Sequence, residues 1–157
     1  MQPRIRSSDR SQHGCSNTSL TREHLRQFLE DNSVSAGIHV LPSATSRVED
    51  SAEALGISTE MLVKSIVLWV SEEYPVIVLA AGTRRINLSA VARLLLVTRK
   101  QVRLATPEEA LSATGYKVGT IPPLGHRTSL RTLVDVSVMA SDEPRDSTLP
   151  GESDSAT

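Results

Sequence analysis

The sequence predicts an α+β fold, in which helices flank a mixed β-sheet. Two unbroken apolar runs, 66–70 and 76–81, are separated by a short polar turn over 71–75, a pattern typical of a hairpin near the centre of a sheet. Capped amphipathic segments on both sides of this pair predict helices. The 157 residues include one Phe, one Trp and two Tyr, so we expect a core of aliphatic side chains.

The part of the chain before the hairpin combines two predicted helices with one strand. The helix expected over 21–31 begins with a threonine, whose hydroxyl can accept a hydrogen bond from a free amide of the first turn. Residues 37–41 predict a short strand. Ser46 and Glu49 have the spacing of a capping box, and they predict a second helix that ends at Gly56.

Beyond the hairpin, two further predicted helices flank another short strand. Asn87 is suited to cap a helix that continues to Leu95, and residues 101–104 predict a strand. The Thr-Pro-Glu-Glu sequence that begins at Thr106 provides a cap, a proline at the first helical position and acids at the positive end of the helix dipole. We expect this helix to end at Gly115.

The composition changes in the last third of the chain. Residues 119–126 are rich in glycine and proline and predict a loop, and residues 131–139 predict a final strand. The residues after Ala140 include five acids and one large apolar residue, Leu149, which is too little to offset the entropy lost on ordering. We therefore predict a disordered basic arm over 1–18, a folded domain over 19–140 and a disordered acidic tail over 141–157.

The composition also excludes several classes of protein. Cys15 is the single cysteine, so the sequence predicts neither a disulfide framework nor a Cys-x-x-Cys metal site. The four histidines lack the spacing of metal ligands, and we expect neither a metal nor another cofactor. No apolar run approaches the length of a membrane span, and no signal peptide is recognisable. These features predict a soluble, cytoplasmic protein.

Positive charge gathers in the middle of the chain. The segment 84–134 carries nine lysines and arginines against two glutamates. Such side chains can neutralise nucleic-acid phosphates and release their counterions, although a solvated helix and strand surface is the alternative interpretation. The scarcity of aromatic residues argues against a protein that binds single strands by stacking on the bases.

Three ordered segments carry more specific information than the composition does. They are MLVKSIVL from Met61, RLATPEE from Arg103 and TGYKVGTIPPLGH from Thr114. Together with the preceding AEALGI segment from Ala52, they resemble, in order and spacing, the motifs of the YbaK-type prolyl-tRNA editing domains. The resemblance covers about residues 36–139.

The resemblance implies a fold and an activity. The expected fold is a central, barrel-like mixed sheet flanked by helices. The expected activity is removal of a mischarged, Cys- or Ala-like amino acid from tRNA-Pro by ester hydrolysis, with the ribose hydroxyl of the tRNA helping to position water. The implied partners are the acceptor end of tRNA-Pro and a prolyl-tRNA synthetase.

The resemblance also implies the site residues. Lys64 matches the family's catalytic lysine, and Gly119 belongs to a Gly-x-x-x-Pro element whose amides can hold a carbonyl oxygen. Taken alone, Lys64 is more typical of an exposed surface residue, and the loop is equally compatible with a plain structural turn. The expected substrate-binding residues are Ser65, Gly82, Thr120, Pro123, Gly125, His126 and Asp135. The expected tRNA-binding residues are Arg84, Arg85 and Arg93.

The resemblance ends near Met139, where relatives continue with a glycine-containing segment, another strand and a helix. We therefore expect a domain that is incomplete at its C-terminal end. The alternatives to a working deacylase are a catalytically inactive, truncated variant that binds only tRNA or a synthetase, and a general nucleic-acid-binding protein that uses the basic segment.

Overall fold

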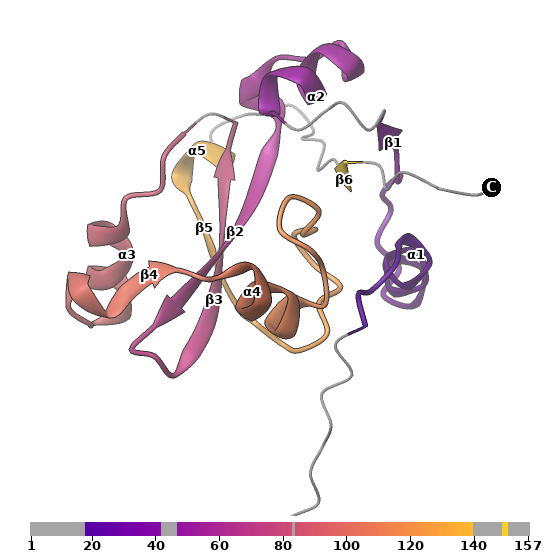
Figure 1. Ribbon diagram of the computed structural model, residues 1–157. Coiled ribbons are helices and arrows are strands. Elements are labelled where there is room, and N and C mark those ends of the chain that lie inside the picture. The colour runs from indigo at the N-terminus through magenta and orange to yellow at the C-terminus, as the bar shows by residue number, and fades with distance from the viewer. Residues whose placement is uncertain (1–17, 42–46, 83, 140–148, 151–157) are drawn as a thin grey trace, which may run out of the picture.

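The computed structural model describes residues 18–41, 47–82, 84–139 and 149–150, and it contains a four-stranded mixed sheet (Figure 1). The strand order is β4-β2-β3-β5; β2 is antiparallel to both β3 and β4, whereas β5 is parallel to β3. The predicted hairpin is confirmed as the centre of this sheet. The strands are β2 (Val63–Val70), β3 (Tyr74–Ala81), β4 (Val102–Leu104) and β5 (Arg131–Val134).

One face of the central hairpin packs against α3 (Leu88–Leu95). Leu68 and Val78 are buried on this face, together with Val91 and Leu95 of the helix. Alternate residues of a strand share a face, so the even-numbered residues of β2 and β3 point towards α3. In Figure 1, α3 lies on one side of the sheet and α1 (Arg22–Asp31) on the other.

The predicted caps of three helices are confirmed. The Thr21 hydroxyl accepts a hydrogen bond from the His24 amide of α1, and the Asn87 side chain caps α3. In α4 (Pro107–Thr114), Thr106 and Glu109 form a reciprocal capping box. These helices were predictable because each cap joins residues only two or three positions apart.

The second helix starts from a different cap than the sequence suggests. α2 (Val48–Leu55) begins after Arg47, whose amide donates to the Asp50 carboxylate at 3.2 Å. The predicted capping box of Ser46 and Glu49 is therefore wrong, because the carboxylate that accepts the cap amide belongs to Asp50 and not to Glu49. Ser46 itself lies outside the described residues. The predicted end of the helix at Gly56 is confirmed.

Strand boundaries differ from the predictions at both ends of the domain. The strand expected over 37–41 is limited to β1 (Val40–Leu41). The strand expected over 131–139 ends at Val134, and α5 (Val136–Met139) follows, because Asp135 accepts the Ser137 amide at 2.9 Å and starts a helical turn.

Part of the predicted tail forms a strand. β6 (Leu149–Pro150) pairs in parallel with β1, so the expectation of a disordered tail is wrong at these two residues. The rest of the tail, and the basic arm as far as residue 17, lie outside the described residues. Within the part of the chain that the structure describes, no helix is long and apolar enough to cross a membrane.

Arg103 ties the hairpin turn to the start of α4. Its guanidinium donates to Glu72 at 2.6 Å and to Glu109 at 2.8 Å. Glu109 is held as an anion, because the Arg103 hydrogen bond, followed by the Thr106 amide, lowers its pKa to about 2. Arg103 lies in the basic segment but is already neutralised by two carboxylates, which makes it a poor ligand for RNA phosphates.

The Glu109 ion predicts a specific acid dependence of stability. Its pKa in the folded protein, about 2, lies below the ordinary value of 4.5, so its contribution is present above about pH 4.5 and disappears as the pH falls towards 2. Glu109→Gln should therefore lower the urea midpoint at pH 7, with a smaller difference from wild type at pH 3. Glu108→Gln, in the same helical turn, is the control. An equal effect of both variants at both pH values would contradict this account.

Candidate functional site

Three strands bring sequence-predicted site residues to the same end of the sheet, where the strands begin or finish. β2 begins there, whereas β3 and β5 end there. Lys64 pairs in register with Ala80, the Gly82 amide donates to the Leu62 carbonyl at 2.7 Å, and the Asp135 amide donates to the Leu79 carbonyl at 2.9 Å. We call this end of the sheet, defined by Lys64, Gly82 and Asp135, the Lys64 edge; the name refers to the ends of the strands and not to an outer strand.

Lys64 is half-buried at the start of β2. Desolvation by burial lowers the pKa of its ammonium, and the nearby Glu49 carboxylate acts in the opposite direction. Because Lys64 shares its strand face with Ile66, it lies on the side of the sheet that packs against α3. A partly dehydrated ammonium with three donors interacts more strongly with an anion or a polarised carbonyl than a fully hydrated one does.

Ser65 points to the opposite face of the sheet from Lys64. Successive side chains of a strand alternate between faces, and Ser65 pairs with Leu79 whereas Lys64 pairs with Ala80. The two neighbours in sequence therefore do not form one cluster of side chains. Sequence proximity suggested a shared site, and the strand conformation separates them.

Gly82 is buried where β3 leaves the sheet, and the packing there has no room for a side chain. Its φ is +42°, and a Cβ atom would lie 2.2 Å from the Thr59 carbonyl oxygen of η1 (Thr59–Met61). That contact is with backbone, which cannot rotate away. The structure thus gives Gly82 a packing role at the Lys64 edge.

Asp135 is engaged within its own segment. Hydrogen bonds from the Ser137 side chain and amide, with a further contribution from the Arg84 charge, lower the pKa of its carboxyl group. Asp135 thus caps α5 as an anion and lies within electrostatic reach of Arg84. A carboxylate in this role orients the backbone at the sheet edge and partly balances the neighbouring cation.

The expected tRNA-binding arginines are all exposed. Arg84 follows β3, with its amide donating to the Ala81 carbonyl at 3.0 Å, Arg85 is its neighbour, and Arg93 lies on α3. Residues 84–102 contain no acidic side chain. This surface therefore begins at the Lys64 edge and continues along α3.

The glycine- and proline-rich loop follows α4. Gly119 is exposed with φ +92°, and a Cβ atom there would meet no heavy atom within 4 Å. Thr120 is tied back to the Lys117 carbonyl, which accepts from the Thr120 amide at 3.0 Å and from its hydroxyl at 2.9 Å. Gly119 is thus an open tip at which a ligand can approach the backbone closely.

The other end of the loop packs on α1. A Cβ at Gly125 (φ +75°) would lie 3.0 Å from Leu25 and 3.4 Å from Phe28. Burial lowers the pKa of the His126 imidazole, and its Nε2 lies 2.8 Å from the Pro122 carbonyl oxygen. Gly125 and His126 therefore serve contacts inside the protein.

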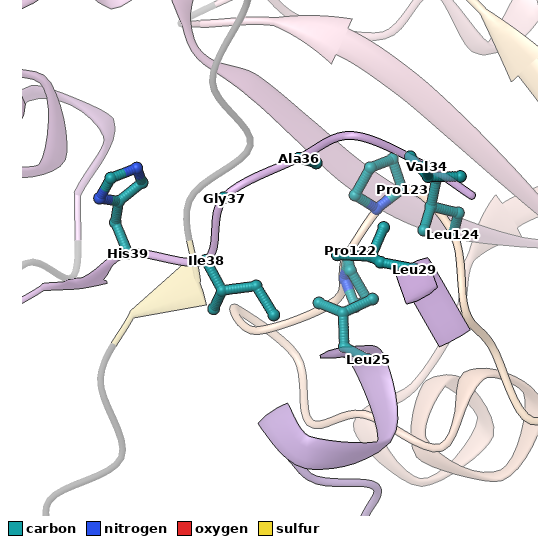
Figure 2. Close-up of a pocket in the computed structure, with 10 residues that line it drawn as sticks. All are labelled: Leu25, Leu29, Val34, Ala36, Gly37, Ile38, His39, Pro122, Pro123 and Leu124. Atoms are coloured by element: carbon teal, nitrogen blue, oxygen red, sulfur yellow. The ribbon is translucent and has the colours of Figure 1, made fainter. Parts of the chain in front are cut away.

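An apolar cavity lies between this loop and α1 (Figure 2). Leu25 and Leu29 of α1 face Pro122, Pro123 and Leu124 of the loop, and the segment 34–39 closes another side. In Figure 2 the His39 ring is directed away from the other side chains. Of the expected substrate-binding residues, the lining includes Pro123, and Lys64 is not part of it.

Most of the sequence-predicted residues therefore fall into two groups. Lys64, Gly82, Asp135 and Arg84 lie at the Lys64 edge, whereas the residues between 119 and 126 belong to the loop that packs on α1. Ser65 lies on the opposite face of β2 from Lys64, and Arg93 lies on α3. The sequence analysis assigned Glu49 to a helix cap and missed the effect of its charge on Lys64. It also missed Tyr116, buried beneath the loop, although this residue lies within one of the recognised segments.

Among the described residues there is no group of three or more His, Cys, Asp or Glu side chains arranged to hold a metal ion. The Lys64 edge instead carries the Lys64 ammonium, the Arg84 guanidinium and the Asp135 carboxylate, and the exposed backbone of the Gly119 tip belongs to the separate loop. Ammonium, guanidinium and amide groups are donors that can bind an anion or a carbonyl oxygen.

The chain is similar to several solved and curated proteins. A crystal structure described as that of a "putative trans-editing enzyme for prolyl tRNA synthetase" superposes with a TM-score of 0.70 and 29% identity, over 78% of each chain. The proline–tRNA ligase of Acidithiobacillus ferrooxidans is 36% identical over 88 residues, which are 56% of this chain and 15% of the ligase. YwhH of Bacillus subtilis, an uncharacterised protein, is 25% identical over 117 residues, 74% of this chain and 70% of that protein.

The matched segment thus spans about 15% of the length of the ligases, and the match does not assign the activity of the whole ligase to this chain. The family model described as the aminoacyl-tRNA editing domain matches residues 42–155, well beyond Met139, where the motif resemblance ends. With a mixed sheet flanked by helices and this match over most of its length, the chain belongs to the aminoacyl-tRNA editing domain family.

Proposed function

We propose that this chain is an aminoacyl-tRNA deacylase that hydrolyses the ester of a Cys- or Ala-like amino acid mischarged on tRNA-Pro. The observation that carries the proposal is the position of Lys64, a half-buried cation at the start of a central strand in an editing-domain fold. Similarity to part of proline–tRNA ligases supports tRNA-Pro as the substrate and a prolyl-tRNA synthetase as the source of the mischarged tRNA.

Lys64 is proposed to bind the terminal phosphate of the tRNA or the region of the aminoacyl carbonyl. Its partial burial removes competing water, which strengthens its interaction with charge that develops in the transition state. Ser65 lies on the other face of the strand, so a direct contact between Ser65 and substrate would have to come from that side.

Gly119 is proposed to present its amide to the carbonyl oxygen of the ester. Water attacks the carbonyl carbon, the bond to the ribose oxygen breaks, and that oxygen leaves with the electron pair and takes up a proton. The products are the free amino acid and a tRNA with a free terminal hydroxyl. Thr120 and Pro123, which follow Gly119 in the loop, remain proposed contacts with the substrate.

The reason for such an enzyme is physical. A synthetic site selects by binding, and a pocket built for a larger apolar substrate discriminates against a smaller one by only a modest factor. A second site that hydrolyses the wrong ester supplies the missing discrimination. Its own pocket has to exclude the correct amino acid.

The specificity is tested with three charged tRNAs. Release of alanine from Ala-tRNA-Pro is expected, whereas Pro-tRNA-Pro and Ala-tRNA-Ala should decay at the buffer rate. Equal hydrolysis of Ala-tRNA-Pro and Ala-tRNA-Ala would show that the tRNA is not recognised as proposed. Hydrolysis of Pro-tRNA-Pro at the same rate as Ala-tRNA-Pro would show that the site does not discriminate among amino acids.

The exposed arginines predict how tRNA binding responds to salt. Each of Arg84→Gln, Arg85→Gln and Arg93→Gln should weaken tRNA binding and lower the slope of log K against log salt by about 1, because one phosphate contact is lost. Filter binding or fluorescence anisotropy between 50 and 200 mM salt measures this slope. Arg22→Gln, which removes an exposed cation on α1, is the control. The interpretation would be wrong if the three variants kept the wild-type slope.

A further inference from the structure

The loop between α4 and β5 is closed at its base by backbone hydrogen bonds. The Arg127 amide donates to the Thr114 carbonyl at 2.8 Å, and the Leu20 amide donates to the Gly115 carbonyl at 2.6 Å. Thr114 is fully buried, and its hydroxyl accepts from the Tyr116 amide at 3.0 Å. The two ends of the loop are therefore fixed next to each other.

Two aromatic side chains brace the loop from inside. Tyr116 is 3% exposed, and its hydroxyl donates to the Gly125 carbonyl at 3.2 Å. His126 is half-buried, and its Nε2 lies 2.8 Å from the Pro122 carbonyl oxygen. Since a carbonyl oxygen can only accept, this nitrogen carries the proton and the imidazole acts as a donor.

Both braces end on backbone carbonyls of the segment that carries the proposed substrate contacts. Tyr116 holds the carbonyl group of Gly125, and His126 holds that of Pro122. The Gly119 tip is the open part of the loop. The loop thus combines an open tip with a stem held by hydrogen bonds from buried side chains, which is the arrangement that preorganised amides require.

We propose that Tyr116 and His126 are positioning residues, which hold the backbone from 119 to 125 in the conformation that the reaction needs. His126 acts through the Pro122 carbonyl rather than by contact with the substrate. This inference rests on the proposed function, because it assigns the loop to the deacylation reaction. It adds two residues that act on the loop and not on the ester.

Variants that remove one donor at a time test the proposal. Tyr116→Phe deletes the hydroxyl alone, and His126→Leu removes the imidazole donor at similar volume. His126→Gln keeps an N–H donor and should restore most of the wild-type behaviour. Tyr74→Phe, at the half-buried tyrosine that packs against the α3 side of the sheet, is the matched control.

Hydrogen exchange reads the loop without any substrate. The amides of Thr120 and Arg127 are hydrogen-bonded inside the loop. In Tyr116→Phe and His126→Leu they should exchange about tenfold faster than in wild type, the factor expected for one hydrogen bond of ordinary strength. Amides of β2 and β3 should be unchanged. Exchange that rises equally in the loop and the sheet, or in neither, overturns the proposal.

Kinetics of the same variants tests the link to the reaction. Release of alanine from Ala-tRNA-Pro should show kcat lowered about tenfold with KM unchanged in Tyr116→Phe and His126→Leu, and near wild type in His126→Gln and Tyr74→Phe. A raised KM with unchanged kcat would instead make His126 a substrate contact and contradict the inference. If wild type itself released no amino acid, the proposed function would fail, and with it the assigned role, whereas hydrogen exchange would still report the bracing.

Discussion

Lys64→Ala should lower the rate of deacylation by about 10²- to 10³-fold, the loss found when one preorganised electrostatic group is removed from an active site. Lys64→Met keeps much of the hydrocarbon stem and should lose as much activity, because the ammonium and not the stem interacts with the substrate. Single-turnover release of alanine from Ala-tRNA-Pro measures both variants.

The same variants should remain folded. Desolvation disfavours the charged form of Lys64 in the native protein, so removal of the ammonium is not expected to destabilise the fold. Melting temperatures close to that of wild type are the expected result. Arg22→Gln, on α1, serves as the activity control. Full activity of Lys64→Met would exclude Lys64 from the chemistry.

Gly82→Ala should lower the free energy of unfolding by about 3 kcal/mol or more, because overpacking and backbone strain act together. The new Cβ would lie 2.2 Å from the Thr59 carbonyl oxygen, at a φ of +42° that alanine adopts unfavourably. Urea denaturation followed by circular dichroism measures the change.

Gly56→Ala is the matched control for this prediction. Gly56 ends α2 with φ +67°, but a Cβ there would meet no heavy atom within 4 Å. Its expected cost is the backbone strain alone, about 1 kcal/mol. Equal stability losses in the two variants would contradict the close packing of β3 against η1.

The parts of the fold that the sequence predicted well depend on neighbours along the chain. Thr21, Asn87 and Thr106 each accept a hydrogen bond from an amide two or three residues further along the chain, and the two apolar runs of the hairpin are joined by a short turn. Such features are set by local backbone chemistry and by burial of a whole strand. The same reasoning, with the recognised motifs, placed Lys64 at the start of a central strand.

The features that the sequence analysis missed depend on contacts between residues far apart in the chain, or on the hydrogen bond of a single side chain. Arg103 was counted only among the cations of the basic segment, because its partner Glu72 lies 31 positions earlier in the chain. Asp135 was placed inside a strand, but its carboxylate starts a helical turn by accepting the Ser137 amide. The opposite orientation of Lys64 and Ser65 becomes clear only when both residues are placed in a regular strand.

The candidate site was likewise predicted in part. The recognised motifs predicted Lys64, Gly82, Asp135 and the loop around Gly119, and the backbone pairing of the sheet places Lys64, Gly82 and Asp135 at the same end of the strands. The internal roles of Gly125 and His126 were not visible, because they depend on the packing of α1 and on the folded shape of the loop.

The central claim is that this chain hydrolyses mischarged tRNA with Lys64, and one measurement tests it most directly. Excess wild-type protein and excess Lys64→Met are each mixed with Ala-tRNA-Pro, and free alanine is followed over time. The account predicts release well above the buffer rate for wild type and release near the buffer rate for the variant. Wild-type release at the buffer rate, with Ala- and Cys-tRNA-Pro alike, would contradict it.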